Sequence, residues 1–461
     1  MIGDELKYHV LQSFRLTPTA EQAEAVRVFA DFMSTRDSRV VMLLRGSAGT
    51  GKTTLAAAIV RGMMTLKQKL VLLAPTGRAA KVFSLYAGNP AYTIHRHIYR
   101  EKSMGGSFEL NFNKHRDTLF VVDEASMISN QGLGETAFGS GCLLDDLMSF
   151  VYGGDANCRL LLIGDAAQLP PVGETESPAL TAFALRAYGM TVYEADLNEV
   201  LRQSQESGIL YNATLIRNSL FPTLPKVCLG FPDIRVVPGD ELVESLATSY
   251  SQVGQDGTIV ITRSNKRANI YNQGIRNTVL DREDELCRGD RLMIVKNNYF
   301  WRKNEFIANG DMAVVQRVRH IHEMHGFRFA DITMTFPDYD DYELTATTLL
   351  DTLTSEAPAM TRDQQDQLFN KVMEDYADIP LKADRMKKIK EDRYYNALQV
   401  KFAYAVTCHK AQGGQWQHVY IDQGYMTDDM LTPDYLHWLY TAFTRATEKL
   451  FLVNWPGTQV E

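Results

Sequence analysis

The chain has 461 residues, of which 45% are apolar and 23% charged, an ordinary composition for a globular protein with two or more domains. No apolar run reaches the length of a membrane-spanning helix, and five scattered cysteines without CxxC spacing argue against a zinc site and a disulfide framework. The net charge is −8, but segment 331–380 holds 12 acidic and 2 basic residues, so it carries −10 and the remainder +2. We therefore expect no membrane partner, and an acidic segment that faces solvent away from any polyanion. The first residues lack the apolar core of a signal peptide, which predicts a cytoplasmic location.

Short apolar strands alternate with helical stretches along the first 200 residues, as in a buried parallel sheet with helical crossovers. The predicted strands are 40–44, 70–74, 119–122, 160–163 and 191–194. A second set follows at 258–262, 402–406, 418–421 and 450–453. The predicted fold class is therefore α/β, with two parallel-sheet domains at 1–200 and 201–461.

Each predicted domain contains an insertion. At about 100–118 a glycine pair and the alternation of Phe108, Leu110 and Phe112 predict a small hairpin in the first domain. At about 311–400 a β-like stretch followed by the acidic segment predicts a small β-rich subdomain in the second. The basic stretch 381–393 is interpreted as a solvated helix face, with phosphate contact as the alternative.

A glycine-rich loop follows the first predicted strand. "GSAGTGKTT" has Gly46, four residues and then Gly51-Lys52-Thr53, between an apolar strand and an alanine-rich helix. In this pattern the backbone N–H groups cradle phosphates, Lys52 reaches the outer phosphates and the Thr53 hydroxyl ligates Mg²⁺. The sequence therefore predicts a nucleotide site at Gly46, Ala48, Gly49, Thr50, Gly51, Lys52, Thr53 and Thr54.

Polar residues follow two further predicted strands. Asp123 and Glu124 end the strand in "TLFVVDEASMI", at the sheet edge that the phosphate loop faces. Asp123 can hold Mg²⁺, mainly through water, and Glu124 can polarise an attacking water, whereas a helix cap is the alternative. Gln168 in "GDAAQLPPVG" can contact the γ-phosphate. Arg202 and Arg445 are candidates to stabilise the transferred phosphoryl group, although each taken singly suits a surface salt bridge.

The order of these segments carries a resemblance. The phosphate loop is followed by "APTGRAAKVF", "TIHRHIY", "VVDEAS", "GDAAQLPPVG", "LRQ", "AVTCHKAQGGQW" and "YTAFTRA". This series resembles the ordered motifs of superfamily 1 helicases, and the "TIHR" and "HKAQG" versions are similar to the RecD/Dda-like branch, superfamily 1B. The resemblance covers nearly the whole chain and implies two RecA-like domains, with the hairpin and the β-rich subdomain inserted in them.

The resemblance also implies roles for residues that spacing alone does not explain. Gln22 matches the glutamine that reads adenine, and Gln412 and Gly413 lie toward the nucleotide. The positions that match single-strand contacts are Pro75, Thr76, His95, Asn297, Thr407 and His409. The hairpin with Phe108 and Phe112 matches the wedge that splits the duplex, with a small packed hairpin as the alternative.

For the whole protein the resemblance implies an ATP- and Mg²⁺-dependent DNA helicase. Such an enzyme moves 5′→3′ on single-stranded DNA, separates forked duplexes and serves DNA replication, repair or recombination near the nucleoid. A helicase subunit of a larger nuclease complex and an RNA-directed helicase remain alternatives. The acidic segment 331–380 is a candidate docking surface for a protein partner.

Overall fold

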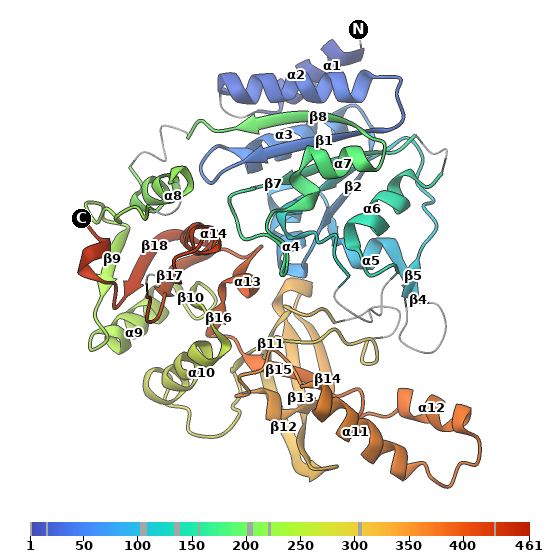
Figure 1. Cartoon of the computed structure of the whole chain (residues 1–461), viewed down its shortest axis with the longest axis vertical. Coiled ribbons are helices and arrows are strands. Elements are labelled where there is room, and N and C mark those ends of the chain that lie inside the picture. Colours follow the sequence, from blue (N-terminus) through green and yellow to red (C-terminus); the bar gives the residue numbers. More distant parts are fainter. Residues whose placement is uncertain are drawn as a thin grey trace.

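Two parallel sheets and a β-barrel make up the chain in the computed structural model (Figure 1). The structure describes residues 2–14, 17–101, 108–132, 139–154, 157–200, 206–219, 223–302, 307–427 and 430–461. The first sheet lies at the top of Figure 1, the second at the left and the barrel at the bottom. Among these described residues there is no helix with the length and apolar character needed to cross a membrane.

The first sheet has six parallel strands in the order β3-β2-β6-β7-β1-β8. Leucine and β-branched residues fill its central strands, and alternate side chains of β1 enter two separate cores, with Met42 on one face and Leu43 on the other. Helices therefore cover both faces, as the apolar runs predict. The strands are β1 (Val40–Gly46), β2 (Lys69–Ala74), β3 (Ala91–Thr93), β6 (Thr118–Val122), β7 (Arg159–Gly164) and β8 (Thr191–Leu197). The helices are α1 (Ile2–Gln12), α2 (Ala20–Ser34), α3 (Lys52–Thr65), α4 (Gly77–Ala87), α5 (Ile94–Ile98), α6 (Leu143–Tyr152) and α7 (Ala182–Ala187).

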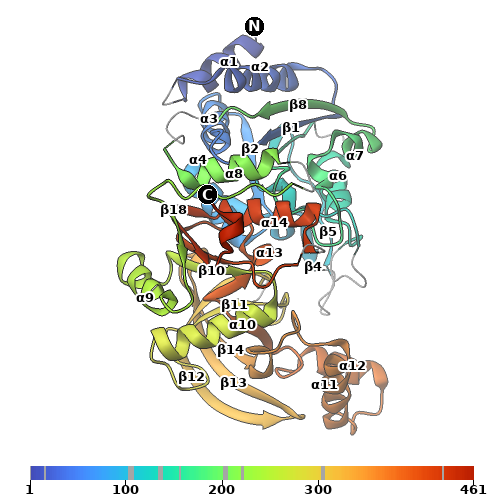
Figure 2. The ribbon, with the colours of Figure 1, turned by 60° about the vertical axis from the view of Figure 1, so that its left-hand side comes forward.

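The second sheet has five parallel strands in the order β16-β10-β17-β18-β9. One of its faces packs on α8 and α14, which lie side by side (Figure 2). The strands are β9 (Ile234–Val237), β10 (Thr258–Thr262), β16 (Ala405–Thr407), β17 (Trp416–Asp422) and β18 (Ala446–Val453). The helices are α8 (Gly208–Asn218), α9 (Leu242–Val253), α10 (Asn265–Gly274), α13 (Cys408–Ala411) and α14 (Pro433–Phe443).

After α10 the chain leaves the second sheet, forms a closed five-stranded barrel and returns to the sheet at β16. Its apolar interior is continuous with the core under α9 and α10. The strands are β11 (Arg291–Ile294), β12 (Met312–Met324), β13 (Phe327–Phe336), β14 (Tyr342–Leu349) and β15 (Leu398–Phe402). Between β14 and β15, α11 (Arg362–Asp375) and α12 (Lys382–Lys390) project from the barrel at the lower right of Figure 1.

The two α/β sheets and the β-rich subdomain confirm the predicted fold class, with local differences. The predicted strand 402–406 is wrong as one element, because β15 ends at Phe402 in the barrel and β16 begins at Ala405 in the second sheet. Hydrophobicity runs on through Ala403 and Tyr404, which are both buried, so it gives no sign of the change of sheet. The barrel also includes β11, upstream of the expected start at 311; the domain boundaries themselves stay a prediction.

The inserted hairpin consists of β4 (Tyr99–Glu101) and β5 (Phe108–Leu110), which pair antiparallel. The alternation in the sequence suggested a strand that continues to Phe112. In the structure the strand ends at Leu110, and Asn111 instead accepts the Phe112 amide through its side-chain oxygen at 2.9 Å. Such a local bond competes with strand pairing.

Candidate nucleotide site between the two parallel sheets

The glycine-rich loop turns sharply between β1 and α3. Gly49 and Gly51 have φ values of 78° and 77°, in the left-handed region that favours glycine. A side chain on Gly46 would meet the Thr50 hydroxyl at 2.9 Å, so the loop also needs glycine where the strand ends. Lys52 Nζ crosses the loop and donates to the Gly46 carbonyl at 3.0 Å. The result is a compact loop at a helix N-terminus, the geometry that binds anions.

Gln22 connects this loop to the N-terminal helix α2. Its side-chain amide donates to the Thr50 carbonyl at 3.0 Å, while its oxygen accepts the Thr19 amide at 3.0 Å in a capping box. Gln22 is 3% exposed. It therefore braces the phosphate loop; adenine reading by this residue stays a prediction.

Asp123 and Glu124 lie directly after β6, two strands from β1 in the sheet. Asp123 accepts the Glu124 amide at 2.9 Å with one oxygen and the Tyr86 hydroxyl with the other. Glu124 is in the left-handed region, with φ of 52°. Within the described residues its buried Oε2 atom has no hydrogen-bond partner. A buried carboxylate oxygen without a partner is costly, and such groups concentrate at functional sites.

Charges from both halves of the molecule act on Glu124. Burial raises the pKa of its carboxyl group, and the neighbouring Asp123 raises it further. Arg445 and Lys52 oppose this shift, so both cations lie within electrostatic range of Glu124. The lysine of the phosphate loop and an arginine that precedes β18 therefore both act on an acid with a shifted pKa.

The turn after β7 forms the next part of the site. Gln168 is 4% exposed, and its Oε1 atom is another buried oxygen without a partner in the described chain. The following residue, Leu169, receives two bonds from the second sheet. Its amide donates to the Thr441 hydroxyl at 2.7 Å, and its carbonyl accepts the Gln412 side-chain amide at 2.7 Å. The Gln168 turn is thus held to the second domain at two points.

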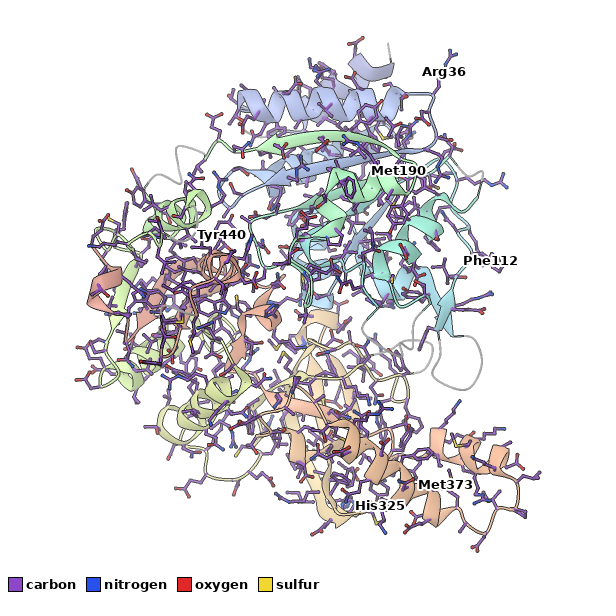
Figure 3. All side chains as sticks on the ribbon, in the orientation of Figure 1. Arg36, Phe112, Met190, His325, Met373 and Tyr440 are labelled. Carbon is purple, nitrogen blue, oxygen red and sulfur yellow. The ribbon has the colours of Figure 1, made fainter. Side chains whose placement is uncertain are left out.

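Tyr440 on α14 joins the phosphate loop to the β7 turn. Its hydroxyl accepts the Ala48 amide at 2.9 Å and donates to Asp165 at 2.6 Å. Figure 3 labels Tyr440 where α14 approaches the first sheet. His437, one turn earlier, is 2.9 Å from the Ala167 carbonyl through Nδ1. Sequence reasoning did not select Tyr440, although it lies in "YTAFTRA", five residues before Arg445.

The two predicted arginines have different outcomes. Arg445 is 2% exposed and donates through Nε to the Thr441 carbonyl at 3.0 Å and through Nη1 to the Gly414 carbonyl at 3.1 Å. It is therefore a buried cation of the interface, and among the described residues no carboxylate is hydrogen-bonded to it, unlike a surface salt bridge. Arg202 lies outside the described residues.

The strand ends also bring predicted single-strand contacts to the same interface. Thr76 caps α4 by accepting the Ala79 amide at 3.2 Å, with Pro75 just before it. Gly413, with φ of 72°, packs against this cap, and a side chain there would lie 3.1 Å from Ala79 Cβ. The segment that runs from Thr407, at the end of β16, through His409 to Gly413 therefore meets the start of α4 at Gly413.

Comparisons with known proteins agree with this geometry. Residues 17–219 match the AAA domain, and residues 402–453 match the UvrD-like helicase C-terminal domain. Over 422 residues the chain is 25% identical to the ATP-dependent RecD2 DNA helicase of Deinococcus radiodurans, covering 89% of this chain and 46% of that protein. It is 26% identical over 266 residues to the ATP-dependent DNA helicase dda of Enterobacteria phage T4, covering 54% of this chain and 55% of that one. A crystal structure of a Pif1 helicase from Bacteroides has the same fold, with a TM-score of 0.50, 16% identity, and coverage of 97% and 95%.

The two family matches and the RecD2 and dda relatives support the assignment of this chain to superfamily 1B of the helicases. The chain spans about half the length of the RecD2 and dda relatives.

Asn297 joins the barrel entrance to the segment after the second sheet's strand β16. Its side-chain oxygen accepts the Asn309 amide at 2.6 Å, and the Asn309 side chain accepts a hydrogen bond from Lys410, next to His409. Burial lowers the pKa of Lys410 to about 8, so this cation is partly withdrawn from water. Asn297 and Lys410, far apart in sequence, are therefore linked through Asn309 in one short network.

The two aromatic residues predicted for the hairpin lie in contrasting surroundings. Phe108 packs on Tyr299 of the second domain, with ring centroids 4.6 Å apart. Phe112 is 71% exposed at the edge of the molecule, with the Arg100 guanidinium 4.9 Å from its ring (Figure 3).

His95 lies on α5 near Tyr99, and burial lowers its pKa to about 4, so it is a neutral group at pH 7. The wedge and the strand contacts stay predictions.

Proposed function

We propose that this protein hydrolyses ATP with Mg²⁺ and uses the reaction to move 5′→3′ along single-stranded DNA and separate duplex strands. The observation that carries the proposal is the buried Oε2 atom of Glu124, which has no hydrogen-bond partner among the described residues and lies within electrostatic range of Lys52 and Arg445. A site of that kind suits a reaction whose transition state is stabilised by charged side chains from both domains at once.

The residues of the site fit a nucleotide and its metal ion. The left-handed glycines and Lys52 suit the phosphates, and the orphan oxygens of Glu124 and Gln168 suit a water and a γ-phosphate. Thr53, in the first turn of α3, and Asp123, through water, would hold Mg²⁺. That ion neutralises phosphate charge, and it keeps several water ligands, so it requires few protein ligands.

Each side chain then has a separate task. Lys52 binds the outer phosphates, and Glu124 orients and polarises the attacking water. Gln168 contacts the γ-phosphate and connects to the second sheet through its neighbour Leu169. Arg445, and Arg202 by the family resemblance, meet the charge that develops on the transferred phosphoryl group.

Movement requires that this site change the grip on nucleic acid. Thr76 belongs to the α4 cap, and Thr407 and His409 to the segment that packs on it through Gly413. Closing or opening the nucleotide site therefore changes how the two candidate strand-binding surfaces face each other. Alternating closure with alternating grip produces steps along one strand.

The test is strand displacement on labelled duplexes that carry one single-stranded tail. We expect unwinding with a 5′ DNA tail and ATP, little with a 3′ tail, and none for Lys52→Ala. Faster unwinding from the 3′ tail would contradict the polarity. Preference for an RNA tail would support an RNA helicase, and DNA-stimulated ATP hydrolysis without unwinding would support a subunit of a larger complex.

Location and protein partners belong to the same proposal. A cytoplasmic, nucleoid-associated enzyme fits a DNA substrate. The acidic segment 331–380 covers β14, α11 and most of β13, on the barrel side away from the second sheet, and a partner that docks there remains a prediction.

A further inference from the structure

Arg217 touches the phosphate loop from the second half of the molecule. It lies in the last turn of α8, and its Nη1 atom donates to the Ser47 hydroxyl. Its Nε atom donates to the Asn218 side chain at 3.3 Å. No carboxylate pairs with Arg217 in the part of the chain that the structure describes. The guanidinium has five N–H donors, so it retains capacity for another acceptor.

The Arg217 guanidinium lies at the end of the phosphate loop that Tyr440 also contacts. Ser47 lies between Gly46 and Ala48, and the Ala48 amide is bound by the Tyr440 hydroxyl. Burial raises the pKa of Tyr440 and Asp165 raises it further, whereas Arg217 lowers it, so the guanidinium also lies near this hydroxyl. Arg217 therefore faces the same end of the phosphate loop as Tyr440.

Helix α8 brings Arg217 close to the "YTAFTRA" segment, most of which lies on α14. Ile209, Ala213 and Ile216 of α8 share one buried core with Leu439 and Phe443 of α14. The two helices are packed side by side, and a displacement of one must disturb the other (Figure 2). A force on Arg217 would therefore reach Tyr440, Thr441 and Arg445.

We propose that Arg217 is a nucleotide-contacting residue that exchanges the Ser47 hydroxyl for the outermost phosphate of ATP. This inference rests on the proposed function. A guanidinium binds a phosphate more strongly than a neutral hydroxyl, because the hydrogen bond is charge-assisted. ADP lacks that phosphate, so with ADP the guanidinium stays on Ser47. Arg217 thus distinguishes ATP from ADP and pulls α8 and α14 toward the loop only when ATP is bound.

The experiment compares equilibrium binding of AMP-PNP, a non-hydrolysable ATP analogue, with binding of ADP. Arg217→Ala removes the side chain, and Arg217→Gln retains a donor for Ser47 but not the charge. The matched control is Arg235→Ala, because Arg235 also donates to a serine hydroxyl, Ser245, at 2.9 Å, but from β9 at the far edge of the second sheet. Thermal melts check that each variant is folded.

We expect both Arg217 variants to weaken AMP-PNP binding about 10- to 100-fold, the range for a hydrogen bond to a charged group, and ADP binding less than about threefold. Arg235→Ala should change neither. Equal losses for both nucleotides, or wild-type AMP-PNP affinity in Arg217→Gln, would overturn the inference. A wild-type protein that binds both nucleotides but unwinds nothing overturns only the proposed function, and one that binds neither overturns both.

Discussion

At the residue scale, Glu124 offers a test that separates chemistry from structure. Burial raises the pKa of its carboxyl group above the ordinary 4.5, and the charge of Asp123 is the next cause. The unfolded chain therefore releases this proton at a lower pH than the folded chain, so the free energy of unfolding falls as pH rises above 4.5. Glu124→Gln keeps the size and removes the charge. We expect nucleotide affinity within about threefold of wild type, turnover lower by about 10²- to 10⁴-fold, and a higher melting temperature at pH 8. A variant that melts earlier and loses nucleotide binding would make Glu124 a structural residue.

Residues at the ends of strands were predictable and those that cross the interface were not. Lys52, Glu124 and Gln168 each follow an apolar run, so their place at the sheet edge comes from local pattern. Tyr440 is 392 residues from Ala48, and Arg217 is 170 residues from Ser47. No periodicity connects positions that far apart, because their contact depends on how two complete sheets pack.

At the scale of elements, the junction between α4 and the loop after α13 depends on Gly413. Its φ of 72° strains any other residue, and an added Cβ would lie 3.1 Å from Ala79 Cβ and 3.2 Å from the Thr76 hydroxyl. Gly424 has a φ of 70° but no atom within 4 Å of an added Cβ, which makes it a matched control. We expect both alanine variants to lose about 1 kcal/mol from strain, and Gly413→Ala alone to lose DNA-stimulated ATP hydrolysis. Equal activities in the two variants would show that the close approach has no role.

Element boundaries were predictable where a strand is central and buried. The range 258–262 corresponds to β10 at both ends, and the strands of the first sheet differ by a few residues. The short edge strands β3 and β9 were missed, since three or four residues with partly exposed side chains carry little pattern. The prediction of one strand at 402–406 was wrong because the pattern there is strong but continuous. The residues on both sides of the change from barrel to sheet are buried, so they form one unbroken apolar stretch.

At the scale of the whole molecule, the barrel is joined to the first sheet by a contact that no sequence pattern indicated. Asp311, at the barrel entrance, accepts the Ala308 amide at 2.8 Å and the Tyr339 hydroxyl at 2.9 Å. Tyr339 and Asp311 lie directly over Gly77, the first residue of α4, and a Cβ added there would collide with the Tyr339 ring and lie 3.1 Å from Asp311 Oδ1. Lys81, one turn further along α4, donates to the Pro337 carbonyl. The barrel therefore packs on the helix whose cap holds Thr76.

This contact should make stability depend on pH in a definite direction. Burial raises the pKa of Asp311 from 3.8 to about 7, with Asp338 adding to the shift, and the bonds from Ala308 and Tyr339 and the charge of Arg302 opposing it. Between about pH 4 and 7 the unfolded chain has lost this proton and the folded chain keeps it, so stability falls as pH rises and levels off above 7. Asp311→Asn cannot ionise. We expect wild type to lose on the order of a few kcal/mol more between pH 5 and 8 than Asp311→Asn, measured by urea unfolding, and the exposed Asp340→Asn to behave as wild type. Identical pH profiles for wild type and Asp311→Asn would mean that this carboxyl is ionised in the folded protein, and that the barrel rests on α4 without a buried proton.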